Sequence, residues 1–159
     1  MMFKDTYEYD SIAAAFYIVA WANQHKVTIN LTKTQKLLYI AYGAHLGLRN
    51  NRLCNEHPQA WPYGPVFPRT REALLGIDLY EVEMSHPRIA EVKDDEYLKN
   101  LTEFVFKGFG NYTASQLTVW SHSPNTPWDK TQDIDGFYWG MEMPDNYIRK
   151  YFSSIITTQ

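Results

Sequence analysis

A dense group of prolines interrupts the chain between residues 53 and 68. Four prolines and one glycine fall in this stretch: Pro58, Pro62, Gly64, Pro65 and Pro68. Each proline lacks a backbone donor and disfavours helical backbone at the residue before it, so no helix can run through the segment. Four bulky apolar residues stand among the prolines: Trp61, Tyr63, Val66 and Phe67. Because a flexible linker would not carry such side chains, we predict an ordered loop or a short extended pair, packed against a helix.

Two helices are predicted before this segment. Asp10 and Ser11 are both suitable N-caps for an apolar stripe that predicts a helix over residues 11–25. Thr32 and Gln35 have the spacing of a capping box, in which each side chain bonds the other residue's backbone N–H. This spacing predicts a second helix that begins there and ends near Gly47.

Helical patterns return after the proline segment. They predict four helices, over residues 69–75, 94–109 or 95–109, 113–120 and 145–156. Residues 77–92 predict irregular strand or loop, and residues 123–128 predict a turn. The predicted fold class is therefore mainly α, a single compact helical domain of five to six helices with a Pro-rich loop or short β insert. We expect this domain to span residues 1–159, with its core at about 11–152.

Composition places the chain among globular proteins and disfavours binding to nucleic acid. Its 159 residues suit one domain, and 45% of them are hydrophobic against 21% charged. Fifteen Lys and Arg against eighteen Asp and Glu give a net charge of −3, so the basic excess of a nucleic-acid binder is missing. Residues 81–159 are the more acidic half, with seven basic and twelve acidic side chains. That excess could steer a basic partner or simply complement helix dipoles.

The chain shows no signal for export or for the membrane. Its longest apolar stretch, residues 12–22, is about half of the roughly 20 residues needed to cross a bilayer. Acidic residues precede that stretch where a signal peptide carries positive charge. The single cysteine, Cys54, cannot close an intrachain disulfide, which indicates a reducing compartment. We expect a cytoplasmic protein with no membrane partner.

No motif for a metal or a cofactor is present. The five histidines form no HxxxH or HExxH pair, so we expect no metal site. The glycines form no phosphate-binding loop, so we expect no cofactor. His122, near Trp128 and Asp129, could act as a general base with an orienting carboxylate. A histidine at a helix end more commonly bonds a carbonyl.

Gln35 and Lys36 are polar residues beside an apolar helical stripe. A buried amide must find hydrogen-bond partners. For Gln35 these could belong to the Pro-rich segment, as a structural contact, or to a ligand. The sequence leaves the two alternatives open.

Two dense motifs carry a resemblance to a known family. The first reads TQKLLY over residues 34–39 and continues with Gly43, His45 and Leu46. The second comprises Ala60, Trp61 and residues 63–66. Later matching positions follow in order: Thr113, Ala114, Leu117, His122, Pro127 and Trp128. In these motifs the chain resembles the Panacea domain of the SocA-like, phage-associated antitoxins, over roughly residues 11–152.

The resemblance implies an antitoxin rather than an enzyme. Members of the family neutralise a cognate protein toxin, usually encoded by the adjacent gene, by direct protein–protein binding in a type II system. One alternative is an adaptor that delivers the toxin to a cellular protease. A less favoured one is a small enzyme with a pocket near Gln35 and His122, walled by Trp61 and Trp128. Neutralisation itself requires only a rigid surface with aromatic anchors that covers the toxin.

The family motifs supply ten candidate toxin-binding or motif residues. They are Gln35, Lys36, Tyr39, Trp61, Tyr63, Gly64, Pro65, Val66, His122 and Trp128. Gly64 before Pro65 indicates a tight backbone, so we expect these two to be scaffold. Tyr39 and Trp61 have apolar sequence neighbours and are expected to be scaffold as well. For Tyr63, a role in the scaffold and a direct contact with the toxin are equally open.

Overall fold

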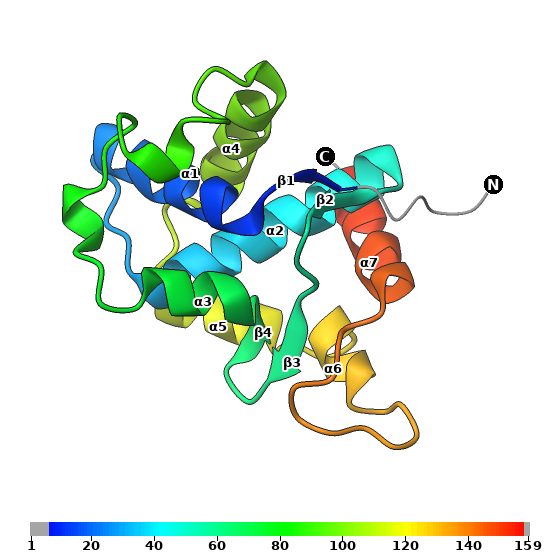
Figure 1. The fold of residues 1–159 in the computed structure, drawn as a ribbon. Helices are drawn as coiled ribbons and strands as arrows, with labels where there is room; N and C mark the ends of the chain where they lie inside the picture. The colour runs from blue at the N-terminus through cyan, green and yellow to red at the C-terminus, as the bar shows by residue number, and fades with distance from the viewer. Residues whose placement is uncertain (1–6, 158–159) are drawn as a thin grey trace.

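A computed structural model describes residues 7–157. Helix α2 (Leu31–Arg49) runs through its middle and is packed by α1, α4, α5 and α7 (Figure 1). Most of α2 is buried on all sides, including residues 33–46. The fold is mainly α, as predicted, and the buried hydrophobic residues form one cluster around this helix.

Helix α1 (Ser11–Gln24) begins as predicted, with the Asp10 carboxylate accepting the Ala13 N–H at 3.1 Å. Helix α2 begins earlier than predicted. Its N-cap is Asn30, whose side chain accepts the Lys33 N–H, so the capping box proposed for Thr32 and Gln35 does not form.

The end of α2 also differs from the prediction. The helix runs through Gly47 to Arg49, and Asn50 caps it in the left-handed conformation. A glycine inside a helix is tolerated where a neighbour approaches closely. Here Gly43 and Gly47 stand one turn apart on the face that packs against α7 (Asp145–Thr157).

The Pro-rich segment forms a short extended pair. Strand β3 (Gln59–Trp61) pairs antiparallel with β4 (Gly64–Val66), with Trp61 opposite Gly64. A second pair was not predicted: β1 (Tyr7–Tyr9) lies parallel to β2 (Arg52–Cys54). Three residues per strand are too few for a period-two pattern to stand out in the sequence.

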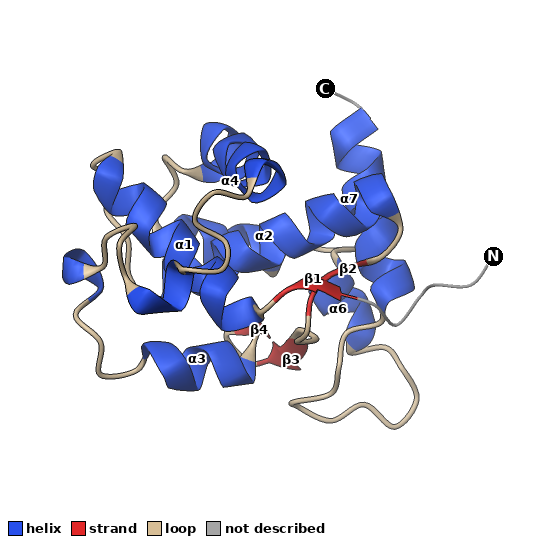
Figure 2. Cartoon of the chain, turned by 45° about the horizontal axis from the view of Figure 1, so that its top comes forward, coloured by secondary structure: helices blue, strands red, loops and turns tan. Residues whose placement is uncertain are grey.

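Three of the other helices pack against α2, and the last of them packs against α7 (Figure 2). They are α3 (Pro68–Leu74), α4 (Glu96–Phe109), α5 (Ala114–Ser121) and α6 (Pro127–Thr131). The capping box of Thr113 and Gln116 forms at the start of α5, as predicted. Residues 123–126 form the predicted turn, but α6 begins at Pro127 and was not predicted, because a proline at the first position of a helix is tolerated and does not end it. The described residues thus form seven α-helices instead of five or six.

Residues 77–92 contain no strand. They form two short 3-10 helices, η1 (Leu79–Glu81) and η2 (Pro87–Ile89), which rest on α1. Between residues 7 and 157, no helix is both long enough and apolar enough to cross a membrane.

Candidate functional site

The β3–β4 hairpin, helix α2 and the end of α5 meet around the second family motif. The Lys36 ammonium on α2 donates to the Tyr63 carbonyl at the tip of the hairpin, at 2.9 Å. Gly64 follows with φ +109°, a backbone conformation that glycine adopts without strain. A Cβ at Gly64 would lie 3.0–3.1 Å from Lys36 Nζ, Ser121 Oγ and His122 Nε2. Gly64 is therefore the point at which three polar side chains converge, as expected of a scaffold position.

Gln35 makes two contacts with one residue of the Pro-rich segment. Its Oε1 accepts the Phe67 N–H at 2.7 Å, and its Nε2 donates to the Phe67 carbonyl at 3.2 Å. This pairing satisfies a buried backbone donor and a buried backbone acceptor at once. The geometry supports the structural role for Gln35, since both ends of its amide are engaged by the chain itself.

We expect Gln35→Leu to destabilise the protein by about 2 to 4 kcal/mol. The substitution leaves the Phe67 N–H and C=O buried without partners, and each such group costs about 1–3 kcal/mol. Urea denaturation measures the change, with the exposed Gln24→Leu as a control that should stay within about 0.5 kcal/mol. Equal stability of the two variants would show that the Phe67 contact does not hold the hairpin to α2.

His122 stacks on Trp128. The two rings are parallel within 3°, with centroids 3.9 Å apart. Trp128 Nε1 donates to the Trp61 carbonyl at 2.8 Å and so joins α6 to β3. The general-base arrangement proposed for His122 does not form, because the Asp129 carboxylate accepts the Asn125 N–H instead.

Two effects disfavour the charged form of the His122 imidazole. Burial lowers its pKa, and the nearby Lys36 ammonium lowers it further. The Tyr63 carbonyl acts in the opposite direction. Within the described residues Nε2 nevertheless has no hydrogen-bond partner of acceptable geometry. The His122 ring therefore serves mainly as a flat surface beneath Trp128.

Lys36 is a buried cation. Within the part of the chain that the structure describes, no carboxylate forms an ion pair with it, and the Tyr63 carbonyl is its hydrogen-bond acceptor. Burial lowers the pKa of this ammonium from 10.5 to about 8. Keeping the charge inside the fold therefore costs stability at neutral pH.

Stability should rise as the pH increases from about 8 to about 9.5. In this window the folded state has released the Lys36 proton, whereas the unfolded state keeps it until about 10.5. The unfolded state thus binds more protons, so raising the pH favours folding, and below pH 8 the full cost of the buried charge remains. Urea denaturation at pH 7.5 and about 9.5 measures the effect. Lys36→Met should remove most of the rise, and an identical rise in this variant would contradict the assignment to Lys36.

The remaining predicted residues are partly buried in the core and partly exposed at the surface. Tyr39 is only 2% exposed and packs against Trp120 and Phe152, in the core. Pro65 and Val66 are buried. Trp61 is half-buried, and Tyr63 beside it is 63% exposed at the hairpin tip.

The loop between α6 and α7 extends this exposed surface. Tyr138 is 62% exposed and Trp139 is 48% exposed, and the Trp139 ring lies 6.0 Å from that of Trp128. Backbone hydrogen bonds of 2.8 Å fix the loop to β3, from Gly140 N to the Ala60 carbonyl and from Ala60 N to the Met141 carbonyl. Sequence reasoning missed this loop. The available signal was its three consecutive aromatic residues between two glycines, at positions 136–140.

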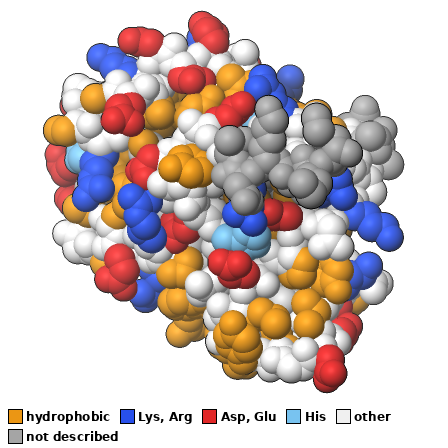
Figure 3. All heavy atoms as spheres, turned by 45° about the vertical axis from the view of Figure 1, so that its right-hand side comes forward, with side chains coloured by type: hydrophobic (Ala, Val, Ile, Leu, Met, Phe, Trp, Pro, Cys, Tyr) orange, Lys and Arg blue, Asp and Glu red, His pale blue; other side chains and the backbone are white. Residues whose placement is uncertain are grey.

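Four aromatic residues therefore form one surface, which we call the aromatic face: Trp61, Tyr63, Trp128 and Trp139. The exposed Tyr138 precedes Trp139 in the same loop. Figure 3 shows hydrophobic side chains gathered on the lower part of the molecule, in the region where Figure 1 places β3, α6 and the loop before α7. Arg71 borders the face, with its guanidinium 5.7 Å from the Trp61 ring centroid.

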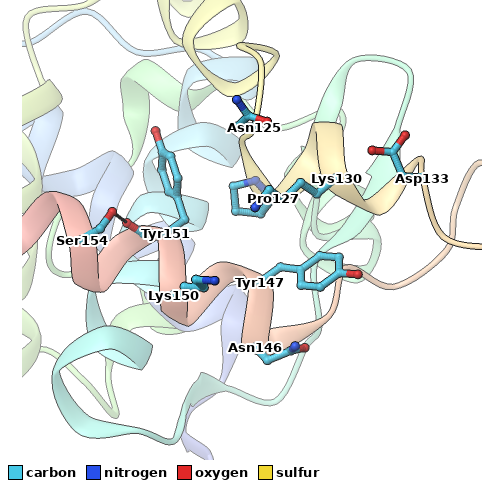
Figure 4. A pocket seen from close by; sticks show the side chains of 9 residues that line it. All are labelled: Asn125, Pro127, Lys130, Asp133, Asn146, Tyr147, Lys150, Tyr151 and Ser154. Atoms are coloured by element: carbon cyan, nitrogen blue, oxygen red, sulfur yellow. Dashed lines mark hydrogen bonds between the residues drawn. The ribbon is translucent and has the colours of Figure 1, made fainter.

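A pocket of about 550 Å³ lies between α6 and α7 (Figure 4). Pro127, Tyr147 and Tyr151 give it apolar walls, and Lys130 and Lys150 give it positive charge. Helix α6 thus separates this pocket from the aromatic face, to which it contributes Trp128. Among residues 7–157 no three His, Cys, Asp or Glu side chains are grouped so that they could hold a metal ion.

The family model described as antitoxin SocA-like, Panacea domain, matches residues 34–129. The chain belongs to this SocA-like antitoxin family. It is also 28% identical to antitoxin SocA of Caulobacter vibrioides, in an alignment that covers 79% of this chain and 72% of that protein. No solved structure matches significantly. All ten predicted motif residues lie within the matched range, whereas Tyr138 and Trp139 lie beyond it.

Proposed function

We propose that this SocA-like protein is the antitoxin of a type II system, which neutralises a cognate protein toxin by binding it through the aromatic face. The observation that carries the proposal is the exposure of Tyr63, Tyr138 and Trp139 on backbone that is fixed by hydrogen bonds. Tyrosine and tryptophan are the residue types that dominate binding energy in protein interfaces. A fixed backbone adds to affinity because little conformational entropy is lost on binding.

The buried part of the motif supports that surface from below. Lys36 holds the tip of the hairpin to α2 through Tyr63, and Gln35 holds the residue that follows β4, Phe67. Trp128 then joins the hairpin to α6. These contacts explain why family motif residues that cannot touch a toxin directly could still be needed for neutralisation.

Co-expression with the adjacent gene tests the proposal. Cells that express the adjacent open reading frame alone should stop growing, and cells that also express this protein should grow. The two proteins should co-purify as a stable complex. Growth rescue without any complex would contradict direct binding, and a toxic frame that this protein does not neutralise would contradict the antitoxin role.

We expect Tyr63→Ala to weaken toxin binding by about thirtyfold, which corresponds to about 2 kcal/mol. The melting temperature should barely change because the ring is 63% exposed. Calorimetric titration with the co-purified toxin and a thermal melt measure the two effects. Tyr80→Ala is the matched control, since Tyr80 is 67% exposed on η1 but lies outside the aromatic face. Equal loss of binding in both variants would contradict the placement of the interface.

A further inference from the structure

The loop that presents Tyr138 and Trp139 is also acidic. We call residues 132–143 the acidic aromatic loop. It carries Asp133, Asp135 and Glu142, all exposed, and neither Lys nor Arg. Within the described residues none of these three carboxylates forms an ion pair or a side-chain hydrogen bond. The loop thus combines exposed rings with three carboxylates that have no ion pair, of which Asp133 also lines the pocket between α6 and α7 together with Lys130 and Lys150.

Some of the other surface carboxylates are neutralised within the fold, whereas Glu83, Glu91 and Glu103 are exposed and form no ion pair among the described residues. Glu8 pairs with Arg49, and Asp10 pairs with Arg69 at 2.9 Å. Asp145, just after the loop, pairs with Arg52 at 2.9 Å. The three loop carboxylates therefore differ from these neighbours. Their charge remains available to a partner, and it repels any negatively charged surface.

The backbone fixes where these charges stand. Gly136 and Gly140 have φ of +82° and +96°, which lets the chain turn sharply on either side of the three aromatic residues. Glu142 forms a β-bridge with Gln59, and the Met143 N–H bonds the Pro58 carbonyl at 3.0 Å. In Figure 3 acidic side chains stand at the lower edge of the molecule, beside the hydrophobic group. The loop is therefore a preorganised surface with an acidic rim.

We propose that the acidic aromatic loop docks into a positively charged groove of the toxin, of the kind that holds a polyanion. This inference rests on the proposed antitoxin function. The rings of Tyr138 and Trp139 supply the buried apolar contact, and the carboxylates around them pair with Lys and Arg side chains that line the groove. Such pairing speeds association and fixes the orientation of the two proteins. Neutralisation then follows because the groove is filled.

Charge argues against other occupants of this face. A second copy of the chain that bound loop to loop about a two-fold axis would bring three carboxylates without ion pairs against the same three. Nucleic acid and anionic lipid would be repelled in the same way. The loop also lies outside the range that the family model matches. The sequence of this loop can therefore be specific to one toxin, while the scaffold that the family shares beneath the loop stays the same.

The test neutralises the three loop charges and compares a matched control. The test variant is Asp133→Asn, Asp135→Asn, Glu142→Gln. The control variant, Glu83→Gln, Glu91→Gln, Glu103→Gln, removes the same charge from exposed positions on the 77–92 segment and α4. These lie at the opposite end of the molecule in both ribbon views. The probe is the protein product of the adjacent toxic reading frame, titrated at 50 mM and 500 mM salt.

We expect the test variant to bind the toxin at least about tenfold more weakly at 50 mM salt, with an unchanged melt. Wild-type affinity should fall steeply between the two salt concentrations, whereas that of the test variant should change little. The control variant should behave like the wild type. Heparin, a polyanion that would occupy a basic groove, should displace the wild-type antitoxin from the toxin.

Three outcomes of the toxin titration would overturn the inference. They are wild-type affinity in the test variant, equal loss in the control variant, and a wild-type complex that heparin does not displace. Concentration-dependent dimerisation of the antitoxin alone through this loop would also overturn it, in favour of a second copy as occupant. If the wild type binds well and only the salt and charge effects are missing, the proposed antitoxin function stands. If the wild type neither binds the toxin nor restores growth, the proposed antitoxin function itself is contradicted.

Discussion

Tyr39→Ala is expected to lower the free energy of unfolding by about 3 to 5 kcal/mol, the cost of truncating a large buried aromatic residue. The Tyr39 ring is 2% exposed and lies 5.5 Å from the Phe152 ring in an edge-to-face arrangement, and 6.5 Å from Trp120. Removing it opens a cavity between α2, α5 and α7. Since a domain of this size has only about 5–15 kcal/mol of stability, the loss is large.

The comparison of Tyr39→Ala with Tyr63→Ala separates scaffold from contact. Thermal melts and toxin co-purification are measured for both variants. Tyr39→Ala should lose its cooperative melt or shift it strongly downwards, and neutralisation should fall with it because the scaffold fails. Tyr63→Ala should keep the melt and lose binding. An unchanged melt for Tyr39→Ala would show that this residue is not part of the core.

The helices could be predicted wherever the sequence carries local signals. Asp10 and the capping box of Thr113 and Gln116 were correct because a cap is a contact between residues three apart. The box of Thr32 and Gln35 has the same spacing but does not form, since Asn30 caps the helix first and the Gln35 amide pairs with Phe67, 32 residues away. Local spacing cannot show that a distant partner competes for the same side chain.

The prediction included the buried part of the candidate site and, through Trp61, Tyr63 and Trp128, some of its exposed part, but it missed the loop that carries Tyr138 and Trp139. The motif residues Lys36, Gly64 and His122 indeed lie together, because the family resemblance identified the hairpin and the helix beneath it. The acidic aromatic loop has neither helical nor strand periodicity, so no pattern marked it. Its position on β3 depends on hydrogen bonds from the backbone N–H groups of Gly140 and Ala60. Such bonds do not require particular side chains, so the sequence does not reveal them.

Gly43 explains how α7 can pack so closely along α2. A Cβ at this position would lie 2.1–2.6 Å from three atoms of the Phe152 ring, closer than any van der Waals contact allows. Phe152 is 1% exposed, so its ring cannot swing into solvent to make room. The Phe152 ring on α7 therefore occupies the space that a side chain at position 43 of α2 would otherwise fill.

We expect Gly43→Ala to destabilise the protein by about 3 kcal/mol, towards the upper end for overpacking, even though alanine favours helix by about 1 kcal/mol. Phe152→Ala should cost about 3–5 kcal/mol through the cavity it leaves. The double variant should lose clearly less than the sum of the two, because the methyl group introduced at position 43 enters the space that the ring has vacated. Urea denaturation of the three variants gives the coupling energy. If the losses of stability in the two single variants add up in the double variant, Phe152 does not fill the space beside Gly43. The packing of α7 on α2 described above would then be wrong.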